Sequence, residues 1–335
     1  MSLKLERPFV IGSGSWGTGL ACLLAANAPT VTIVGRNESF VSEVNDSHTN
    51  GRYLPGAELP KNITATTNLA DTKEADLILL VVPTSALRAT SEKLAQIGIP
   101  ESTVLLSCSK GIERESGKRM TEIIADSFPN NPIAAFSGPN HAEEIARELP
   151  AAATIGCPSP EVGPALRDLF STPRFRAYTN DDVAGVELGG ALKNIFAIAA
   201  GVASGLNLGD NAIAALATRS LAEMVRLGSA LGGKPETFTG LSGVGDMITT
   251  FFSKHSRNHR VGLALAAGKS LDEAVEELGM VAEGVPNTLS IYEAARKVGI
   301  RTPIIDVVYG MLYEDIPPAV ALNKLYEQAP RGEHD

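Results

Sequence analysis

The motif Gly12-Ser13-Gly14-Ser15-Trp16-Gly17 constrains this chain more than any other segment. It follows the apolar run 8–11 and precedes an Ala- and Leu-rich segment that starts at Thr18. In such a strand-turn-helix unit the first glycine permits the tight turn, the second lets a pyrophosphate approach, and the third lets the helix pack closely on the strand. The diphosphate lies on the N–H groups at the positive end of the helix. Gly12, Gly14 and Gly17 therefore predict a dinucleotide site, and a structural turn is the alternative.

The same segment has two features of a signal peptide. Lys4 and Arg7 precede an apolar stretch that ends in small residues near Ala28. However, glycines and serines interrupt that stretch between residues 12 and 19, and the strand-like run 30–34 follows it. The segment is therefore interpreted as the start of a βαβ unit rather than as a cleaved leader.

Composition narrows the class of protein. The chain has 335 residues, enough for two cores, and a net charge of -9, which disfavours nucleic acid as a partner because such binding depends on cations. The cysteines, Cys22, Cys108 and Cys157, are far apart and suggest no disulfide framework, so a reducing cytoplasm is expected. The most apolar segment, residues 183–206, contains Glu187 and Lys193, and we expect no membrane insertion.

The pattern of elements predicts an α/β fold. Strand-like runs at 8–11, 31–35, 76–82, 103–107 and 133–136 alternate with helical segments near 38–44, 86–97 and 118–127. Such alternation is typical of a doubly wound parallel sheet, with ligands at the carboxyl ends of the strands. From residue 181 the segments are helical, at 181–205, 210–231, 258–267, 271–278, 286–298 and 303–313. We expect a dinucleotide-binding domain over 1–180, an all-helical domain over 181–327 and a frayed tail over 328–335.

The end of the second strand decides which dinucleotide binds. An Asp or Glu there would bond the ribose 2'-hydroxyl of NAD. The chain instead has Arg36, which can pair with the 2'-phosphate of NADP or stack on the adenine. NADP(H) is therefore favoured. Glu38 is close enough to Arg36 in the sequence to keep NAD(H) as an alternative cofactor. The alternative without a ligand is that Arg36 is a solvated side chain at a strand end.

Polar segments follow two of the predicted strands. Residues 107–113 carry Lys110, and residues 137–142 carry Gly138 and Asn140. Both segments would lie at the cofactor edge of the sheet. Each is also compatible with a plain strand-to-helix loop.

Two more polar segments lie in the helical half. Gly189 and Gly190 precede Lys193 in the helix at 186–197, although two glycines cost about 1 kcal/mol each relative to alanine. Either a ligand or another backbone reaches the lysine there, or the glycines serve helix packing. Residues 240–246 and 256–258 add a carboxylate, a hydroxyl, a guanidinium and an amide, a set that suits a polyol phosphate.

With these segments in place, the chain resembles bacterial-type NAD(P)-dependent glycerol-3-phosphate dehydrogenases, from Pro8 to about Tyr326. The matching segments occur in the family's order: GSGSWGT, NGRYLPGAELP, SCSKGIE, FSGPNHAEE, VELGGALKNIFAIAAGVASGL, ALATRSLAEM, TFTGLSGVGDMITT, SRNHRVG and VAEG. The resemblance implies a Rossmann-type N-terminal domain and a helical C-terminal domain. It also implies a homodimeric enzyme that reduces dihydroxyacetone phosphate to sn-glycerol 3-phosphate, reversibly, for glycerophospholipid synthesis.

The resemblance further implies the residues of the site. Besides the glycines, the NAD(P)H contacts would be Ser15, Trp16, Arg36, Lys110, Ala142, Arg257, Val281 and Glu283. The substrate contacts would be Lys110, Gly138, Asn140, Lys193, Asp246, Ser256, Arg257 and Asn258. Lys193 matches the family's proton-transfer residue, and the Lys110 cation would lower its pKa toward the operating range. Asp246 would orient the ammonium or bind a substrate hydroxyl, while Arg257 and Asn258 would hold the phosphate.

Two other chemistries fit the sequence less well. His255 and His259 have the spacing of two metal ligands on one helix face, but no Glu or Cys cluster accompanies them, so no metal is expected. Cys108 as a nucleophile is disfavoured because it lies between serines at a buried strand end, without a nearby partner.

Two other functions stay open as alternatives. A hydroxy-acid dehydrogenase of the same architecture would match Gly189 and Lys193 in a GxxxKxxxN helix, but Ala197 replaces the final asparagine. A non-catalytic NADPH sensor would need neither Lys193 nor Asp246.

Overall fold

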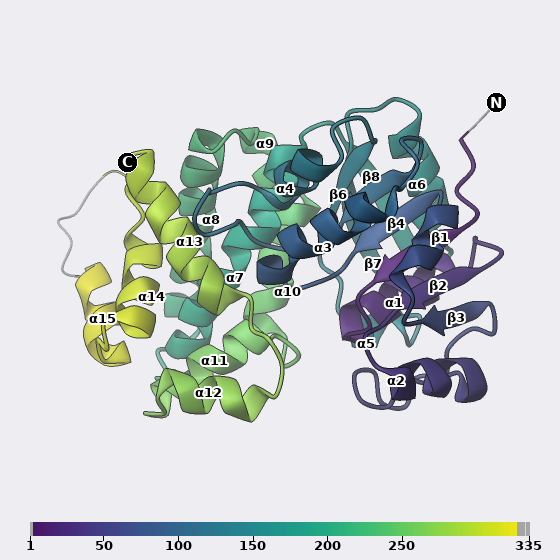
Figure 1. Cartoon of the computed structure of the whole chain (residues 1–335). Coiled ribbons are helices and arrows are strands. Elements are labelled where there is room, and N and C mark those ends of the chain that lie inside the picture. The colour runs from purple at the N-terminus through teal and green to yellow at the C-terminus, as the bar shows by residue number, and fades with distance from the viewer. Residues whose placement is uncertain (1–2, 327–331, 333–335) are drawn as a thin grey trace. The chain divides into compact units, whose positions relative to one another are not determined.

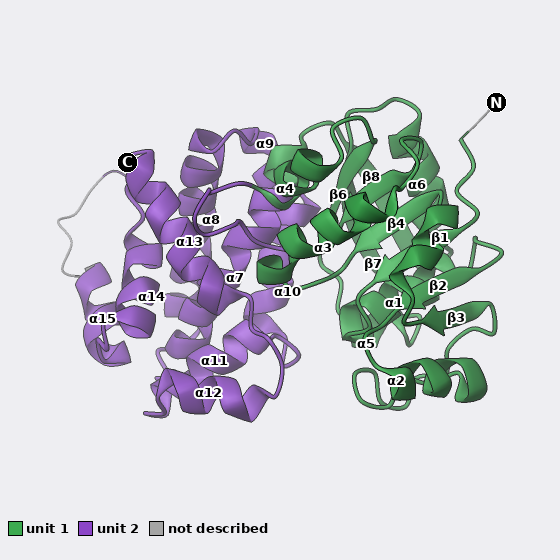
Figure 2. Cartoon of the chain, viewed as in Figure 1, with its two compact units in different colours: residues 1–109, 119–186 green, residues 110–118, 187–335 purple. Residues whose placement is uncertain are grey.

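The computed structural model describes residues 3–326 and residue 332, in two compact units (Figures 1 and 2). Unit 1 contains the residues up to 109 and residues 119–186, and unit 2 contains residues 110–118 and those from 187 onward. The boundary therefore lies a few residues beyond the expected position near 181. The tail expected at 328–335 falls outside the described residues, apart from Gly332.

Packing explains why unit 1 extends past residue 181. A Cβ built on Gly156 would lie 3.1 Å from both Val183 Cα and Val186 Cβ, so the first helical turn after the sheet packs directly on its last strands. The insertion of residues 110–118 into unit 2 has a different cause. Ile112 belongs to the hydrophobic core of unit 2, and Lys110 pairs there with Asp246. These contacts are too distant in sequence for a local pattern to show.

Unit 1 is built on an eight-stranded sheet in the order β3-β2-β1-β4-β5-β6-β7-β8. Its strands are β1 Pro8–Ile11, β2 Val31–Val34, β3 Ile63–Thr66, β4 Leu77–Leu80, β5 Val104–Ser107, β6 Ile133–Ser137, β7 Ala151–Gly156 and β8 Phe175–Asn180. All neighbours run parallel except β6 and β7. The doubly wound sheet is confirmed, and β3, β7 and β8 extend it beyond the five predicted strands.

Each face of this sheet has its own core. Val10 and Leu77 face a cluster that includes α1 (Ser15–Leu24) and α6 (Val162–Phe170). Their chain neighbours Phe9 and Ile78 face a second cluster with α3 (Thr84–Ile97) and α4 (Met120–Ser127). Side chains alternate along a strand, so an entirely apolar strand can bury both faces under helices. The shorter elements of unit 1 are α2 Glu38–Ser42, a π turn Glu43–Ser47, a 3-10 helix Leu69–Glu74 and α5 Ala142–Ile145.

The regular elements that the structure describes in unit 2 are all helical (Figure 2). It contains α7 Val183–Gly205 from Glu187 onward, α8 Asp210–Ala230, α9 Pro235–Phe238, a π turn Leu241–Gly245, α10 Asp246–Phe252, α11 Arg257–Ala266, α12 Leu271–Leu278, α13 Gly284–Lys297, α14 Pro303–Tyr313 and α15 Pro318–Tyr326. All six predicted helices form, with ends within two residues of the expected ones. The short helices α9 and α10 and the terminal α15 were not predicted.

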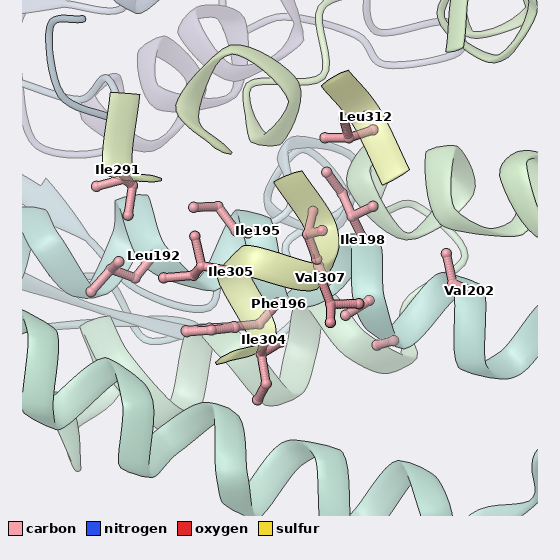
Figure 3. Close-up of a cluster of buried hydrophobic side chains, with 14 of the residues drawn as sticks. Leu192, Ile195, Phe196, Ile198, Val202, Ile291, Ile304, Ile305, Val307 and Leu312 are labelled. Atoms are coloured by element: carbon pink, nitrogen blue, oxygen red, sulfur yellow. The ribbon is translucent and has the colours of Figure 1, made fainter. Parts of the chain in front are cut away.

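Helix α7 is the central element of unit 2. Figure 3 shows Phe196 and Ile195 of α7 among Ile304 and Ile305 of α14 and Ile291 of α13, all of them buried. By length and composition alone α7 is apolar enough to cross a membrane, although we expected no membrane insertion of this segment. However, 89% of its most apolar window is buried inside the protein, as in the core helix of a soluble domain.

Candidate functional site

The glycine-rich loop joins β1 to α1, and its three glycines meet three different constraints. Gly12 has φ 129°, and a Cβ there would lie 2.4 Å from the Val81 carbonyl oxygen. A Cβ at Gly17 would lie 1.9 Å from the Gly12 carbonyl oxygen. A Cβ at Gly14, in contrast, would meet no described atom within 4 Å. The outer glycines are therefore required by the fold, and Gly14 borders open space in which a ligand can approach the backbone.

Helix α1 begins at this loop with an N-terminus suited to an anion. Its N-cap is Gly14, which has no side chain to bond the first N–H groups. Asn50 holds the loop from behind, because its Nδ2 donates to the Ser13 carbonyl at 3.0 Å and to Thr18 Oγ1 at 2.7 Å. Asn50 is not among the predicted site residues, because only the fold brings its polar segment to the loop. The free N–H groups and the helix dipole together favour a diphosphate.

The residues expected to recognise the cofactor's ribose directly follow β2. The Gly12 N–H donates to the Val34 carbonyl at 3.2 Å, so β2 ends beside the glycine loop. Arg36 is exposed two residues later. Glu38 accepts a hydrogen bond from Thr67 Oγ1 at 2.7 Å, at the start of α2. The geometry therefore offers an accessible guanidinium, with the neighbouring carboxylate already bonded to the protein.

Two further expected cofactor residues have structural neighbours in unit 1. The Trp16 ring lies 6.0 Å from that of Phe136, and its Nε1 is buried with no hydrogen-bond partner among the described residues. Ala142 is buried, and its Cα lies 3.2 Å from a Cβ built on Gly19 of α1. Ser15 is the first residue of α1. Trp16 thus lies in the first turn of α1, and Ala142 packs against that helix.

The loop after β6 contains Gly138 and Asn140. Gly138 has φ 146°, and a Cβ there would lie 2.9 Å from Ala153 Cα. This glycine is therefore needed where β6 meets its antiparallel neighbour β7. Asn140 lies just before α5. The fold accounts for Gly138 on its own, whatever it contacts in a substrate.

A buried cluster of charges lies at the centre of unit 2. Lys193 Nζ on α7 is 2.9 Å from Asp246 Oδ1 on α10 and donates to Thr250 Oγ1 at 2.6 Å. Lys110 Nζ is 2.7 Å from the other carboxylate oxygen, Oδ2. The side chains of Lys193 and Asp246 are only 8% and 3% exposed, and that of Lys110 is 16% exposed. The fold thus brings together three residues from distant segments of the chain, and we call this group the Lys-Asp-Lys cluster.

A glycine contact positions Asp246 against α7. A Cβ at Gly189 would lie 2.6 Å from the Ser242 carbonyl oxygen, so only glycine lets the π turn 241–245 approach α7 this closely. Asp246 follows that turn, and Lys193 follows Gly189 by one helical turn. Gly189 is thus a position at which another backbone segment approaches α7. No such contact with a ligand is needed to explain this glycine.

Burial and neighbouring charges set the protonation of this cluster. Burial lowers the pKa of Lys193 from 10.5 to about 8; the Asp246 carboxylate opposes this shift, and the Lys110 ammonium reinforces it. Burial alone would raise the pKa of Asp246, but the two ammonium groups hold it below its usual value. At neutral pH the cluster therefore holds one carboxylate between two cations. Lys193 has a pKa close enough to neutrality to donate or accept a proton.

Sequence reasoning missed two members of the cluster's surroundings. Thr250 is buried and accepts from Lys193, while its hydroxyl donates to the Asp246 carbonyl at 2.6 Å. It lies one helical turn after Asp246, so helical spacing could have identified it. Asn287 on α13 donates to the Lys110 carbonyl at 2.8 Å. No local signal exists for that contact, because the two residues are 177 positions apart.

Residues 256–258, which are expected to hold phosphate, form hydrogen bonds within unit 2. Ser256 caps α11 and accepts from the His259 N–H at 3.2 Å. The amide of Asn258 is buried, with Nδ2 donating to Asn194 Oδ1 and Oδ1 accepting from the Gly284 N–H, both at 2.9 Å. The protein thus uses one donor and the oxygen of Asn258, which leaves its second N–H as the group for a ligand.

Arg257 is half-buried beside the segment that carries Val281 and Glu283. Its Nη1 donates to the Val281 carbonyl at 2.5 Å. Val281 is 48% exposed, and Glu283 is half-buried one residue before α13. Arg257 and Val281, both expected to contact the cofactor, are therefore in direct contact with each other.

The described residues hold no group of three or more His, Cys, Asp or Glu side chains that could bind a metal ion. His255 is exposed, and His259 Nε2 lies 3.4 Å from Ser204 Oγ. Cys108 is buried directly after β5 and forms no disulfide bond.

Comparisons with known proteins agree with this architecture. Residues 9–163 match the model of the NAD-dependent glycerol-3-phosphate dehydrogenase N-terminus, and residues 182–323 match that of the C-terminus. A glycerol-3-phosphate dehydrogenase, NAD(P)+, from Lysinibacillus sphaericus is 44% identical over 99% of both chains. One from Desulfitobacterium hafniense is 42% identical over 97% of this chain and 92% of its own. The crystal structure of glycerol-3-phosphate dehydrogenase from Coxiella burnetii superposes with a TM-score of 0.92 at 38% identity, covering 97% of this chain and 99% of that one. The chain therefore belongs to the NAD-dependent glycerol-3-phosphate dehydrogenase family.

Proposed function

We propose that this protein reduces dihydroxyacetone phosphate to sn-glycerol 3-phosphate with NADPH or NADH, reversibly. The observation that carries the proposal is the Lys-Asp-Lys cluster, in which Lys193 combines burial, a pKa of about 8 and fixed hydrogen bonds. The glycine loop of unit 1 supplies a dinucleotide site in the same chain. The names of the curated relatives support the same reaction. We further propose that the enzyme works in the cytoplasm and supplies glycerophospholipid synthesis.

Lys193 has the central role in the proposed mechanism. A bound nicotinamide would supply a hydride to C2 of the ketone, and the ketone oxygen would then need a proton. Lys193 Nζ donates that proton in reduction and, when neutral, accepts it in oxidation. Asp246 and Thr250 hold the ammonium in place. The positive charge of Lys110 stabilises the alkoxide that develops on the oxygen.

The cofactor phosphates and the substrate phosphate are assigned to different residues. In unit 1, the first-turn N–H groups of α1 next to Gly14 hold the pyrophosphate, and Arg36 pairs with a 2'-phosphate. In unit 2, the Arg257 guanidinium and the second N–H of Asn258 bind the substrate phosphate.

The direct test measures oxidation of NADPH and NADH by the purified chain. The loss of cofactor absorbance reports the rate. Dihydroxyacetone phosphate is compared with a panel of 2-keto acids. We expect turnover with dihydroxyacetone phosphate alone. Turnover of a keto acid would establish the hydroxy-acid dehydrogenase instead. Tight NADPH binding without turnover of any substrate would establish a sensor.

Cofactor preference is predicted to depend on Arg36. Arg36→Asp should lower kcat/KM for NADPH by roughly 10- to 100-fold, the effect of losing a charge-assisted hydrogen bond, and should reverse the preference toward NADH. Arg36→Lys keeps the charge and serves as the matched control. If the NADPH to NADH ratio of kcat/KM is unchanged in Arg36→Asp, Arg36 does not contact the 2'-phosphate.

The pH profile is predicted to move in opposite directions in two variants of the cluster. Reduction needs protonated Lys193, so its kcat should fall as pH rises through about 8, while kcat for oxidation rises. Lys110→Met removes a cation that lowers the pKa of Lys193, so the midpoint should move to higher pH. Asp246→Asn removes the anion that raises this pKa, so the midpoint should move to lower pH. Measurement of kcat against pH at saturating substrates tests both, and shifts in the same direction would contradict the assignment of the midpoint to Lys193.

A further inference from the structure

Asn287 is a buried amide near the start of α13 to which none of the proposed roles has been assigned. It is 1% exposed, and its Nδ2 donates to the Lys110 carbonyl at 2.8 Å. Asparagine is a poor helix former because its amide competes for backbone hydrogen bonds, and burial of an amide is unfavourable unless the amide is hydrogen-bonded. The bond to Lys110 is therefore what offsets the presence of a buried asparagine in this helix.

This bond lies at the point where the chain enters unit 2. Residues up to 109 belong to unit 1, and residues 110–118 belong to unit 2. Just before this point, Ser109 Oγ donates to the Val82 carbonyl at 2.5 Å within unit 1. The bond from Asn287 thus attaches the first residue of the inserted segment to α13.

Two neighbouring contacts also attach the segment to unit 2, but they restrain the backbone of Lys110 less sharply. Ile112 is 3% exposed in the core of unit 2, and apolar packing is non-directional. Arg114 Nε lies 3.7 Å from Glu293 Oε1 on α13, with side chains 63% and 37% exposed, and such surface ion pairs contribute little. The bond from Asn287 is both buried and directional, so it defines where the Lys110 backbone lies.

The position of this backbone matters because the Lys110 ammonium belongs to the Lys-Asp-Lys cluster. A lysine side chain is a flexible four-carbon stem, so the place of its ammonium depends on where the stem begins. Burial lowers the pKa of Lys193, and the Asp246 carboxylate opposes this shift. The cations of Lys110 and Arg257 lower the pKa further. A Lys110 ammonium that left the carboxylate would therefore act less on Lys193.

We propose that Asn287 is a positioning residue, which holds the Lys110 backbone so that the Lys110 ammonium stays on the Asp246 carboxylate. In this role Asn287 needs no contact with substrate or cofactor, and it acts only through Lys110. The role rests on the proposed function, in which Lys193 transfers the proton and Lys110 stabilises the alkoxide. Its electrostatic effect on Lys193 exists in the free protein, and it can be measured without a substrate.

The test is an NMR titration of Lys193 in the full-length chain, prepared with isotope-labelled lysine and without ligands. Lys193→Met identifies the resonance. Lys110→Met should raise the pKa of Lys193 by about one pH unit, the lower end of the effect of a nearby charge. Asn287→Leu keeps the size of the side chain and removes the donor, and it should raise this pKa by a measurable fraction of that amount. Asn287→Leu combined with Lys110→Met should match Lys110→Met alone, because no ammonium is then left to position.

Two further variants separate positioning from a general loss of packing. Asn287→Ala removes the same donor but leaves space instead of filling it, and it should shift the pKa of Lys193 in the same direction. Ser290→Ala is the matched control on α13: Ser290 is 5% exposed, and its hydroxyl donates to the Pro286 carbonyl at 3.3 Å, so this variant loses a hydrogen bond without touching Lys110. It should leave the pKa unchanged. An unchanged pKa in both Asn287 variants, or an equal further rise in the Lys110→Met background, would overturn the proposal.

Kinetics distinguishes this proposal from the proposed function. With dihydroxyacetone phosphate, Asn287→Leu should move the pH midpoint of kcat for reduction upward, as Lys110→Met does, and by less. Turnover by the unmodified chain together with an unmoved midpoint in Asn287→Leu would refute the positioning role. Absence of turnover by the unmodified chain would refute the proposed function, whereas the titration would still decide whether Asn287 positions Lys110.

Discussion

Replacing Lys193 by methionine is expected to lower kcat for dihydroxyacetone phosphate reduction by roughly 100-fold or more, the typical contribution of a general acid. Methionine keeps the apolar stem that packs within α7 and removes only the amine. NADPH affinity should stay nearly constant, because the glycine loop belongs to unit 1. Substrate KM should rise moderately, since an ammonium is lost. Steady-state kinetics and NADPH titration measure the three quantities separately.

Arg257→Met is the comparison for this variant. Loss of a phosphate partner should raise KM strongly, and it should also weaken the cofactor if Arg257 contacts both ligands. A Lys193→Met enzyme with near-native kcat would defeat the assignment of the proton donor. Lys110, on the other carboxylate oxygen of Asp246, would then be the first residue to test.

Gly14→Val is expected to abolish NADPH binding while the protein stays folded. A Cβ at this position meets no described atom within 4 Å, so the valine side chain enters the space that we assign to the pyrophosphate. Fluorescence or calorimetric titration measures the binding, and far-UV circular dichroism and Tm report the fold. Tight NADPH binding by this variant would show that the motif is a structural turn and not a dinucleotide site.

Gly17→Ala is the matched control. The Cβ added at Gly14 enters open space, whereas the Cβ added at Gly17 meets the protein backbone. That atom would lie 1.9 Å from the Gly12 carbonyl oxygen, so α1 has to move away from β1. Overpacking of this kind costs about 1–3 kcal/mol, which lowers Tm. A stability loss at Gly17 together with a binding loss at Gly14 would separate the packing glycine from the ligand glycine.

The strands that the sequence predicted are those with the strongest local signal. Leu77–Leu80 is apolar throughout and buried on both faces, which distinguishes it from amphipathic segments. The strands missed are weaker in composition or position. β3 and β8 are sheet edges with alternating burial, and β7 is alanine-rich, a composition with little strand preference. Only pairing with a neighbour makes these segments strands.

The residues of the site also differ in this respect: some carry a local sequence pattern, and others do not. The GxGxxG spacing marked Gly14, and the two glycines shortly before Lys193 marked that lysine, because both are patterns over a few neighbouring residues of the chain. Asn50 and Asn287 had no such pattern. Each acts on a partner far away in the chain, and such a contact has no spacing that a sequence can display.

The sequence by itself determined the order of the predicted strands and helices, the glycine loop and the identity of the charged residues, because strand and helix periodicity and glycine's conformational freedom act over a few residues. Only the tertiary structure decided that Lys110, Lys193 and Asp246 form one buried cluster and that residues 110–118 join unit 2. It also decided the pKa of Lys193, since desolvation and Coulomb interactions depend on distance in space rather than along the chain.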